Sequence, residues 1–192
     1  KKKKRNIKID HFNVVSSDFF LPEYSEVKHL FENGKPLDTQ LEKIVTERTK
    51  EITDSIAYSK HIQDAILPSK DLMFKNLPNS FVYYNPKEVI GGDFYWMRKK
   101  GKKLFIAVAD CTGHGVPGGF VSMVGANGLN RCVNEYDLTK PADILDRLTL
   151  LVQDAFKGRK DGMDMSICSY QEKSKILQWA GAQNPMFLIS KH

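Results

Sequence analysis

The sequence lacks any long apolar run. No stretch approaches the roughly 18 apolar residues that a membrane-spanning helix needs. The opening KKKKR is not followed by the apolar segment of a secretory signal. We therefore expect no membrane span in this chain and a cytoplasmic location, either free or as the cytoplasmic part of a membrane-anchored sensor. Because the first residue is Lys1 and not Met, we also expect a piece of a longer protein.

Cysteine is scarce, and the excess positive charge is confined to one end. The three cysteines, Cys111, Cys132 and Cys168, have no paired spacing, which is typical of reduced thiols in a cytosolic protein. Residues 1–10 hold six basic side chains and one acid, so they account for +5 of the net charge of +6. A nucleic-acid groove would spread its charge over the fold, so we expect no nucleic-acid partner. The cluster is either a solvated tail or the cytoplasmic flank of an upstream membrane segment.

The sequence contains no internal repeat and divides into three parts. Residues 1–38 form a basic N-terminal segment with weak signals, and we assign them no fold. Residues 39–68 have the pattern of one long signalling or coiled-coil helix. Residues 69–192 change to a mixture of strand and helix patterns and are expected to form the main domain.

The long helix carries a narrow apolar stripe. Thr39 and Glu42 form a capping box at its start, and Pro68 ends the pattern. The stripe residues recur at mostly three-, four- or seven-residue steps: Leu41, Ile44, Val45, Ile52, Ile56, Ile62, Ala65 and Ile66. Such a stripe either packs on the helix's own domain or pairs with a second copy in a parallel coiled coil. We expect the second arrangement, a homodimer through residues 39–67.

The third part alternates between strands and helices. Helix patterns cover residues 117–133 and 141–156. Segments rich in aromatic and branched residues predict six strands: residues 81–86, 93–97, 103–110, 163–170, 175–181 and 185–190. Neighbouring pairs of strands with helices inserted between them predict an α+β layered fold.

Two aspartates are brought together by the hairpin predicted around RKKGKK. A tight turn centred on Gly101 and Lys102 places Asp93 opposite Asp110 on the neighbouring antiparallel strand. Two like charges in this arrangement are unfavourable unless they share a proton or bind a cation. An all-oxygen site suits Mg²⁺ or Mn²⁺. The remaining alternative is a pair of unrelated surface aspartates.

Glycines surround both aspartates. Gly91 and Gly92 precede Asp93, and four more follow Asp110: Gly113, Gly115, Gly118 and Gly119. Without side chains, these positions let a ligand or another backbone approach closely. The second loop leads into a helix whose free amides attract anions, so a cation beside it indicates a phosphate site. The residues expected to face that phosphate are Gly92, Gly113, His114 and Gly115. His114 is either such a contact, to phosphate or to a metal-bound water, or a loop histidine hydrogen-bonded to the backbone.

Four stretches resemble a known family. VIGGDFYW, FIAVADCTGHGVPGGFVSM, GMDMSIC and LQWAGAQNPMFLI are similar to the bacterial PPM-type (protein phosphatase 2C-like) serine phosphatases. The branch is the one named for the sporulation stage II phosphatase E and the stress-response regulator phosphatases. The likeness covers about residues 50–190. It implies an α+β fold in which an antiparallel β-sandwich is flanked by helices.

The resemblance also implies a metal site and an activity. Asp93, Asp110 and the backbone carbonyl of Cys111 match ligands of a centre that holds two Mn²⁺ or Mg²⁺ ions. The implied reaction is hydrolysis of phosphoserine or phosphothreonine on a partner protein by a metal-activated water. In many relatives that partner is an anti-sigma-factor antagonist, and an upstream sensory region controls the phosphatase through the long helix.

The chain departs from the family pattern in two places. The family's TDG-like aspartate and a late Asp-Asp pair would follow residue 192, so we expect this chain to hold only part of the metal shell. Many relatives have a threonine at the position of Asp164. We expect Asp164 and Asp161 to serve loop structure and packing.

Two other functions compete with the phosphatase. IGGDFYW is similar to the GGDEF signature of diguanylate cyclases, but Phe94 and Tyr95 stand where that class has a second acid. A non-catalytic signalling or dimerisation module, such as a pseudophosphatase, is the stronger alternative. The sequence leaves open the identity of the substrate protein, the upstream signal and the choice between the two metals.

Overall fold

The computed structural model describes residues 37–68, 70–157 and 159–189, and the weak signals noted in residues 1–36 lie outside this part. The contacts divide the chain into two units between Thr49 and Lys50. The three-part division at residues 38 and 68 stays a prediction.

Helix α2 (Leu37–Ile66) is the long helix that the apolar stripe predicts. It begins before Thr39, which therefore lies in the first turn, so the predicted capping box at Thr39 is wrong. At its other end the helix stops before Pro68, because proline lacks the N–H that a helix needs. The environment of one helix face changes along its length. Ile52 is 61% exposed, whereas Gln63, about three turns later on the same face, is 1% exposed.

A single antiparallel sheet contains every strand of the described residues, in the order β1-β2-β3-β4. The strands are β1 (Phe94–Lys100), β2 (Lys103–Cys111), β3 (Met163–Gln171) and β4 (Ile176–Ala182). The β1–β2 register runs from Phe94↔Ala109 to Lys100↔Lys103. Gly101 and Lys102 therefore form the turn, and Gly101 adopts a φ of +56°, which favours glycine. This register confirms the hairpin predicted from RKKGKK.

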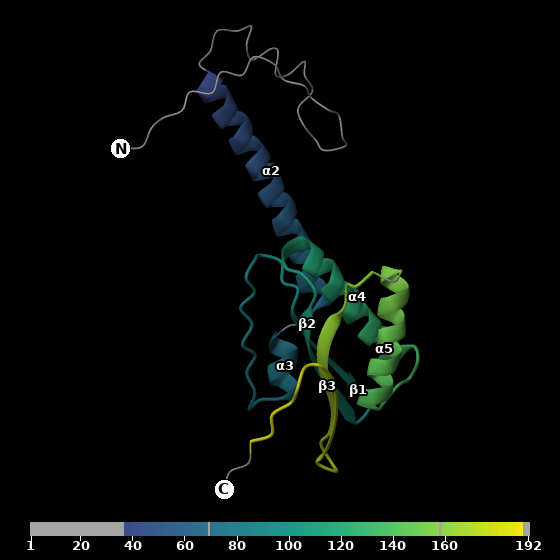
Figure 1. Cartoon of the computed structure of the whole chain (residues 1–192). Helices are drawn as coiled ribbons and strands as arrows, with labels where there is room; N and C mark the ends of the chain where they lie inside the picture. The colour runs from purple at the N-terminus through teal and green to yellow at the C-terminus, as the bar shows by residue number, and fades with distance from the viewer. Residues whose placement is uncertain (1–36, 69, 158, 190–192) are drawn as a thin grey trace, which may run out of the picture. The chain divides into compact units, whose positions relative to one another are not determined.

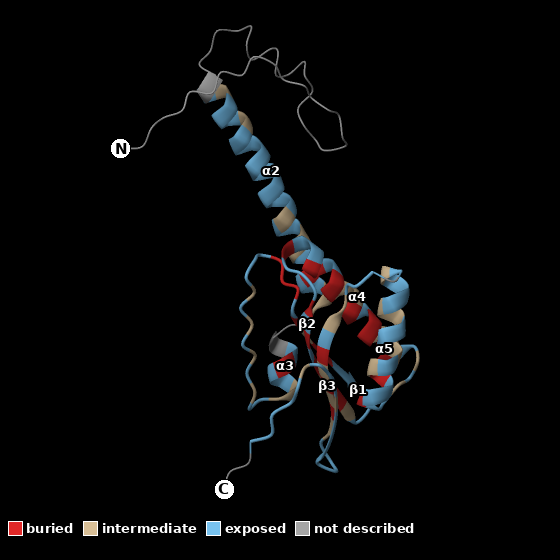
Figure 2. Cartoon of the chain, in the orientation of Figure 1, coloured by how far each residue is buried: buried red, intermediate tan, exposed pale blue. Residues whose placement is uncertain are grey.

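Two helices pack on the sheet (Figure 1). Helix α4 (Gly115–Asn134) contacts β1 and β2, and helix α5 (Pro141–Phe156) contacts α4, β3 and β4. The sequence predicts both helices, and their ends differ from the predicted ones by two residues at most. Buried apolar side chains fill the space between helices and strands: Phe94, Phe105, Leu129, Ile144, Met165 and Ile167. Figure 2 shows in red the buried parts of α4 and of the strands beside it.

Successive side chains of β2 point to opposite faces of the sheet. The residues that enter the core with α4 and α5 are Phe105, Ala107, Ala109 and Cys111. Asp110 lies on the opposite face and is exposed. On this second face, helix α3 (Lys70–Asn76) buries Met73 in a smaller cluster with Met97 and Leu104. The alternation that makes the core therefore also places the acidic residues away from it.

Two predicted strands are absent from the described residues. Residues 81–86 and 185–189 have strand-like composition, but neither segment belongs to a strand. A strand needs a neighbour for its backbone hydrogen bonds, and neither segment has a ladder partner in the part of the chain that the structure describes. Phe81 and Ile189 are 85% and 92% exposed. Of the two sheets in the predicted sandwich, these residues contain one.

No helix within the described ranges is long and apolar enough to cross a membrane.

The core between the sheet and the helices gives a stability prediction. Phe105 is fully buried, whereas Phe120 on α4 is 63% exposed. Phe105→Ala should lower the free energy of unfolding by about 3–5 kcal/mol, because it removes apolar contacts and leaves a cavity. The control Phe120→Ala should cost much less. Urea unfolding of both variants measures the difference, and equal losses would mean that Phe105 is not part of the core.

Candidate functional site

The carboxyl groups of Asp93 and Asp110 meet at the end of the β1–β2 hairpin. The register that pairs Phe94 with Ala109 brings Asp93, the residue before β1, opposite Asp110. Partial burial raises the pKa of Asp110, and the charge of Asp93 and a hydrogen bond between the two side chains raise it further. The predicted juxtaposition of the two aspartates is therefore confirmed. In the absence of a cation, Asp110 reduces the repulsion by holding its proton more tightly.

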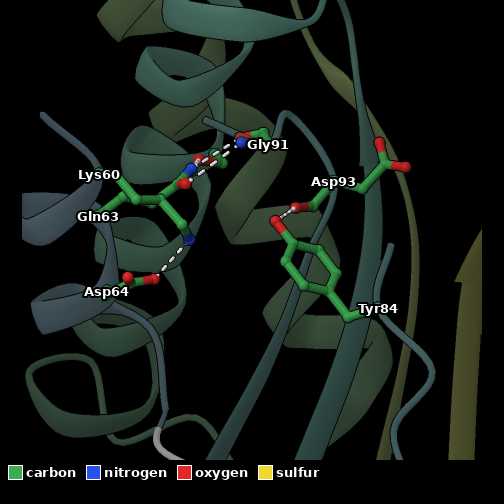
Figure 3. Close-up of polar contacts among 7 residues, drawn as sticks. Lys60, Gln63, Asp64, Tyr84, Gly91 and Asp93 are labelled. Atoms are coloured by element: carbon green, nitrogen blue, oxygen red, sulfur yellow. Dashed lines mark hydrogen bonds and ion pairs between the residues drawn. The ribbon is translucent and has the colours of Figure 1, made fainter. Parts of the chain in front are cut away.

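Tyrosine side chains support the loop that carries Asp93. The hydroxyl of Tyr84 donates a hydrogen bond to the backbone carbonyl of Asp93 over 3.1 Å (Figure 3). The Tyr84 ring packs edge-on against Tyr95, with 6.0 Å between ring centroids. Burial raises the pKa of Tyr84, and the charge of Asp93 contributes to the same shift. The Tyr84 hydroxyl therefore stays protonated at neutral pH and acts as a donor.

A cleft of about 510 Å³ opens beside the two aspartates. Its walls are largely aromatic and aliphatic and come from the extended segment before β1 and from the sheet: Phe81, Tyr83, Tyr84, Tyr95 and Val108. Asp93 and Asp110 are the only acidic residues among those that line it. The carboxylate pair thus faces a space large enough for a phosphorylated side chain.

Three glycine backbones pack against one another behind the aspartates. A methyl group on Gly92 would lie 2.5 Å from the carbonyl oxygen of Gly113. A methyl group on Gly118 would lie 2.5 Å from the same oxygen and 3.0 Å from the Cα of Gly92. Gly113 also has a φ of +86°, which a residue with a Cβ adopts rarely. Of the two uses foreseen for these glycines, the structure shows the approach of another backbone. The roles of Gly92, Gly113 and Gly115 in phosphate binding stay predictions.

His114 contacts a partner that the sequence did not suggest. Its Nδ1 atom makes a close contact with the carboxylate of Glu88, and both side chains are largely exposed. Neither of the alternatives foreseen for His114 included this carboxylate. Glu88 lies 26 residues earlier in a segment without regular structure, so no spacing rule connects the two. His114 also occupies the N-cap position of α4, where its side chain makes no capping hydrogen bond.

Asp164 lies in strand β3 directly opposite Asp110. The expectation that Asp164 serves loop structure is therefore wrong. Met163, the first residue of the predicted strand 163–170, already pairs with Cys111, so Asp164 is part of the sheet. Asp110 and Asp164 are therefore paired on neighbouring strands, and Asp93 lies on the other side of Asp110, just before β1. Among the described residues, however, no three His, Cys, Asp or Glu side chains gather closely enough to hold a metal ion.

The donor atoms at the hairpin end fit part of a site for a hard cation. Two carboxylates in contact supply oxygen ligands, which Mg²⁺ and Mn²⁺ prefer. The Cys111 carbonyl oxygen lies 3.6 Å from the position that a methyl group on Gly92 would take. The thiol of Cys111 points into the core, where burial and the two aspartates raise its pKa to about 12. Its sulfur is therefore buried in the core, and the role of its backbone oxygen as a metal ligand stays a prediction.

Gln63 is a member of this site that the sequence analysis missed. Its carboxamide is buried and contacts Gly91, two residues before Asp93 (Figure 3). A glutamine within an apolar stripe gives no sequence signal of such a role. The contact follows from the fold, which brings α2 beside the loop that contains Gly91.

Comparisons with known proteins agree with the fold. Residues 100–192 match the family model described as "Stage II sporulation protein E (SpoIIE)". The structure described as the SiaA-PP2C domain of Pseudomonas aeruginosa is 30% identical, with a TM-score of 0.62. The match covers 70% of this chain and 55% of that one, so the chain spans about half the length of this structure.

A second solved structure holds the RsbU and RsbW domains of Rv1364c from Mycobacterium tuberculosis, and it is 24% identical. It matches 44% of this chain and 23% of its own length with a TM-score of 0.37. No curated protein sequence gives a significant match. The family match and the SiaA similarity show that this chain belongs to the PPM-type phosphatases, in the SpoIIE branch.

Proposed function

We propose that this chain is the part of a metal-dependent protein serine/threonine phosphatase that holds Asp93 and Asp110. The contact between these two carboxyl groups is the observation that carries the proposal. Such a contact raises the pKa of a carboxyl group and opposes folding unless the two groups bind a ligand between them. The family relationship supplies the class of reaction, the hydrolysis of a phosphate ester.

Each residue of the site has a proposed role. Asp93, Asp110 and the Cys111 carbonyl would hold Mn²⁺ or Mg²⁺. When bound, such ions lower the pKa of a water nucleophile and neutralise charge on phosphoryl oxygens. The Tyr84 hydroxyl holds the backbone of Asp93 in place. The amides at the start of α4, with Gly92, Gly113, His114 and Gly115, would bind the phosphate of the substrate.

The proposed substrate is a phosphoserine or phosphothreonine on a partner regulator. The resemblance to the SpoIIE branch favours an anti-sigma-factor antagonist, which would place the protein in sigma-factor regulation in the cytoplasm. The cleft beside Asp93 is open and lined by exposed aromatic side chains such as Phe81 and Tyr83. An open cleft of this kind suits a phosphorylated segment of a protein better than a small enclosed metabolite.

A non-catalytic signalling module is the second candidate. The observation that favours it is that, although Asp164 lies opposite Asp110, no three acidic, histidine or cysteine side chains of the described residues gather closely enough to hold a metal ion. In such a module the fold would bind a phosphoprotein or a second copy without hydrolysis. Metal binding and turnover distinguish the two functions.

The first test removes one proposed ligand. Asp110→Asn keeps the shape of the side chain and removes its charge. In the protein at its full natural length, Mn²⁺-dependent hydrolysis of an aryl phosphate should fall by more than about 100-fold, since even outer-shell partners typically cost about 10–100-fold. The control Asp146→Asn, at an exposed position of α5, should keep full activity. Full activity of Asp110→Asn would exclude Asp110 as a ligand.

The same variant separates metal binding from folding. The pKa of Asp110 is raised in the folded state, so stability is greater below its unfolded pKa and is lost as the pH rises through the folded pKa. Asp110→Asn should therefore be at least as stable as the natural protein at pH 7 without metal. Mn²⁺ at about 100 times its Kd should stabilise the natural protein by about 2.7 kcal/mol. Asp110→Asn should gain far less in the same thermal unfolding measurement.

We also propose that residues 39–67 mediate a parallel homodimer. Leu41, Val45 and Ile52 are 45%, 61% and 61% exposed, which leaves the first half of the stripe free for a partner. A second copy presents an identical stripe at matching spacing, as a coiled coil requires.

The dimer is tested by placing charge on the stripe. Ile52→Asp combined with Ile56→Asp should shift sedimentation from dimer to monomer, because two buried charges would face each other. The control Lys50→Asp with His61→Asp puts acids on the opposite face of α2 and should leave the dimer intact. Dimers that survive the stripe variant would show that this face does not pair.

A further inference from the structure

The turns of the two hairpins lie side by side at one end of the sheet and are strongly basic. Residues 98–103, which contain the β1–β2 turn, hold five basic side chains and no acid. The β3–β4 turn, residues 172–175, adds two lysines and one glutamate. Lys103 pairs with Gln171, so the two turns are neighbours. The aspartate pair lies at the other end of the same sheet.

Two lysines of the β1–β2 hairpin have partners in the fold. The ammonium group of Lys100 contacts the carboxylate of Asp137 and the backbone carbonyl of Val133. Lys103 donates a hydrogen bond to the carbonyl of Thr139 over 3.1 Å. Both lysines therefore bind the end of α4 and the segment that follows it, which gives them a structural role.

Three further lysines, Lys99, Lys102 and Lys175, line a groove of about 340 Å³, which we call the basic groove. All three are exposed, and their ammonium groups make no ion pair or hydrogen bond with the part of the chain that the structure describes. The groove also offers hydrogen-bonding and apolar groups and one acid: Asn76, Asn79, Ser80, Leu104, Tyr170 and Glu172. Unpaired cations around a concave surface attract an anionic ligand.

The backbone of Lys175 is also unusual. Its φ of +55° lies in the left-handed region, which favours glycine or asparagine. A lysine at this position strains the turn without making a contact within the described residues, so its value to the protein lies in its free side chain. Lysines also protect the open edges of sheets from pairing with other strands. Lys102 and Lys175 lie in turns, so edge protection does not account for them.

The basic groove continues into the cleft beside the aspartates. Leu104 lines the groove and Asp110 lines the cleft, and both belong to the same face of β2. The six residues that separate them span about 20 Å. One wall is continuous, because residues 76–80 line the groove and residues 81–86 line the cleft. This wall is the end of α3 and the extended segment that follows it (Figure 1).

We propose that the basic groove binds an acidic segment of the partner phosphoprotein. The consequence for substrate choice rests on the proposed phosphatase function, whereas the binding itself does not need metal or turnover. An acidic run about six residues from the phosphoserine would occupy the groove while the phosphoserine reaches the aspartates. Two linked contacts bind such a substrate more tightly than either contact alone. A membrane is flat and would meet the turns and not the groove, so a polypeptide fits this site better.

The first test measures binding in the absence of metal. The probe is a fluorescein-labelled peptide of alternating Glu and Gly, and its control has Gln in place of Glu. Fluorescence anisotropy should show binding of the Glu peptide alone. Lys102→Glu combined with Lys175→Glu should weaken it at least about 10-fold, because attraction becomes repulsion at both positions. The control Lys50→Glu with Lys140→Glu changes the net charge equally, away from the groove, and should bind the peptide like the natural protein.

Lys175→Gly separates binding from folding. Glycine adopts a positive φ readily, so the urea midpoint of this variant should equal or exceed that of the natural protein. Its affinity for the Glu peptide should nevertheless fall by about 2- to 5-fold, since one cation is lost. Weaker binding by a variant of full stability cannot come from unfolding. Natural affinity in both groove variants would overturn the proposal.

Other anionic partners are tested with the same groove variants. Phosphatidylglycerol vesicles represent a lipid surface, and an oligothymidylate represents a nucleic acid. We expect both to bind the natural protein less tightly than the Glu peptide does. Binding of either one through Lys102 and Lys175, with no binding of the Glu peptide, would overturn the proposal in favour of that partner.

Turnover of phosphopeptides by the protein at its full natural length tests the consequence for substrate choice. The peptides carry a run of Glu, or of Gln as the control, about six residues before or after a phosphoserine. With Mn²⁺, KM should be about 10-fold lower for one of the Glu peptides than for its Gln control, and Lys102→Glu with Lys175→Glu should remove this difference. Equal KM values in the natural protein would overturn the role in substrate choice. If no phosphate ester is hydrolysed, the proposed function fails, and binding of the Glu peptide would still support the groove.

Discussion

The contact between Asp93 and Asp110 is the constraint on which the surrounding structure depends. Two carboxyl groups in contact repel each other, and nothing in a simple hairpin would hold them together. The β1–β2 register places them opposite each other, and the core beneath prevents the strands from slipping. A slip of one residue would turn the apolar side chains of β2 out of the core. The hydrophobic pattern therefore enforces an electrostatic arrangement that the site itself opposes.

Much of this arrangement could be predicted from local patterns. The period of two residues in KLFIAVADC, the glycine in RKKGKK and the spacing of apolar residues in 141–156 each determine a local structure. Their combination was sufficient to predict the hairpin register and the meeting of Asp93 and Asp110. The motifs around them predicted the family, which the comparisons show.

Other parts depend on neighbours that no local pattern reveals. Residues 81–86 and 185–189 have strand composition, but a strand exists only where another strand pairs with it. The place of Asp164 opposite Asp110 was missed, although strand 163–170 was predicted, because it follows from β2–β3 pairing across a long connection that contains two helices. The contacts of Gln63 with Gly91 and of His114 with Glu88 join residues more than 25 positions apart. Such contacts need the fold before they can be seen.

At the stacked glycines, Gly92, Gly113 and Gly118, an exposed position does not mean a position that tolerates substitution. Surface residues usually accept substitution within about 0.5 kcal/mol, and Gly113 is a surface residue. Its carbonyl nevertheless lies where side chains on Gly92 and Gly118 would have to go, and its own φ favours glycine. One added methyl group at Gly92 or Gly118 would push the loop before β1 and the start of α4 apart. The loop before β1 and the start of α4 can therefore shift only together. A survey of allowed substitutions would find this exposed turn as restrictive as the buried core.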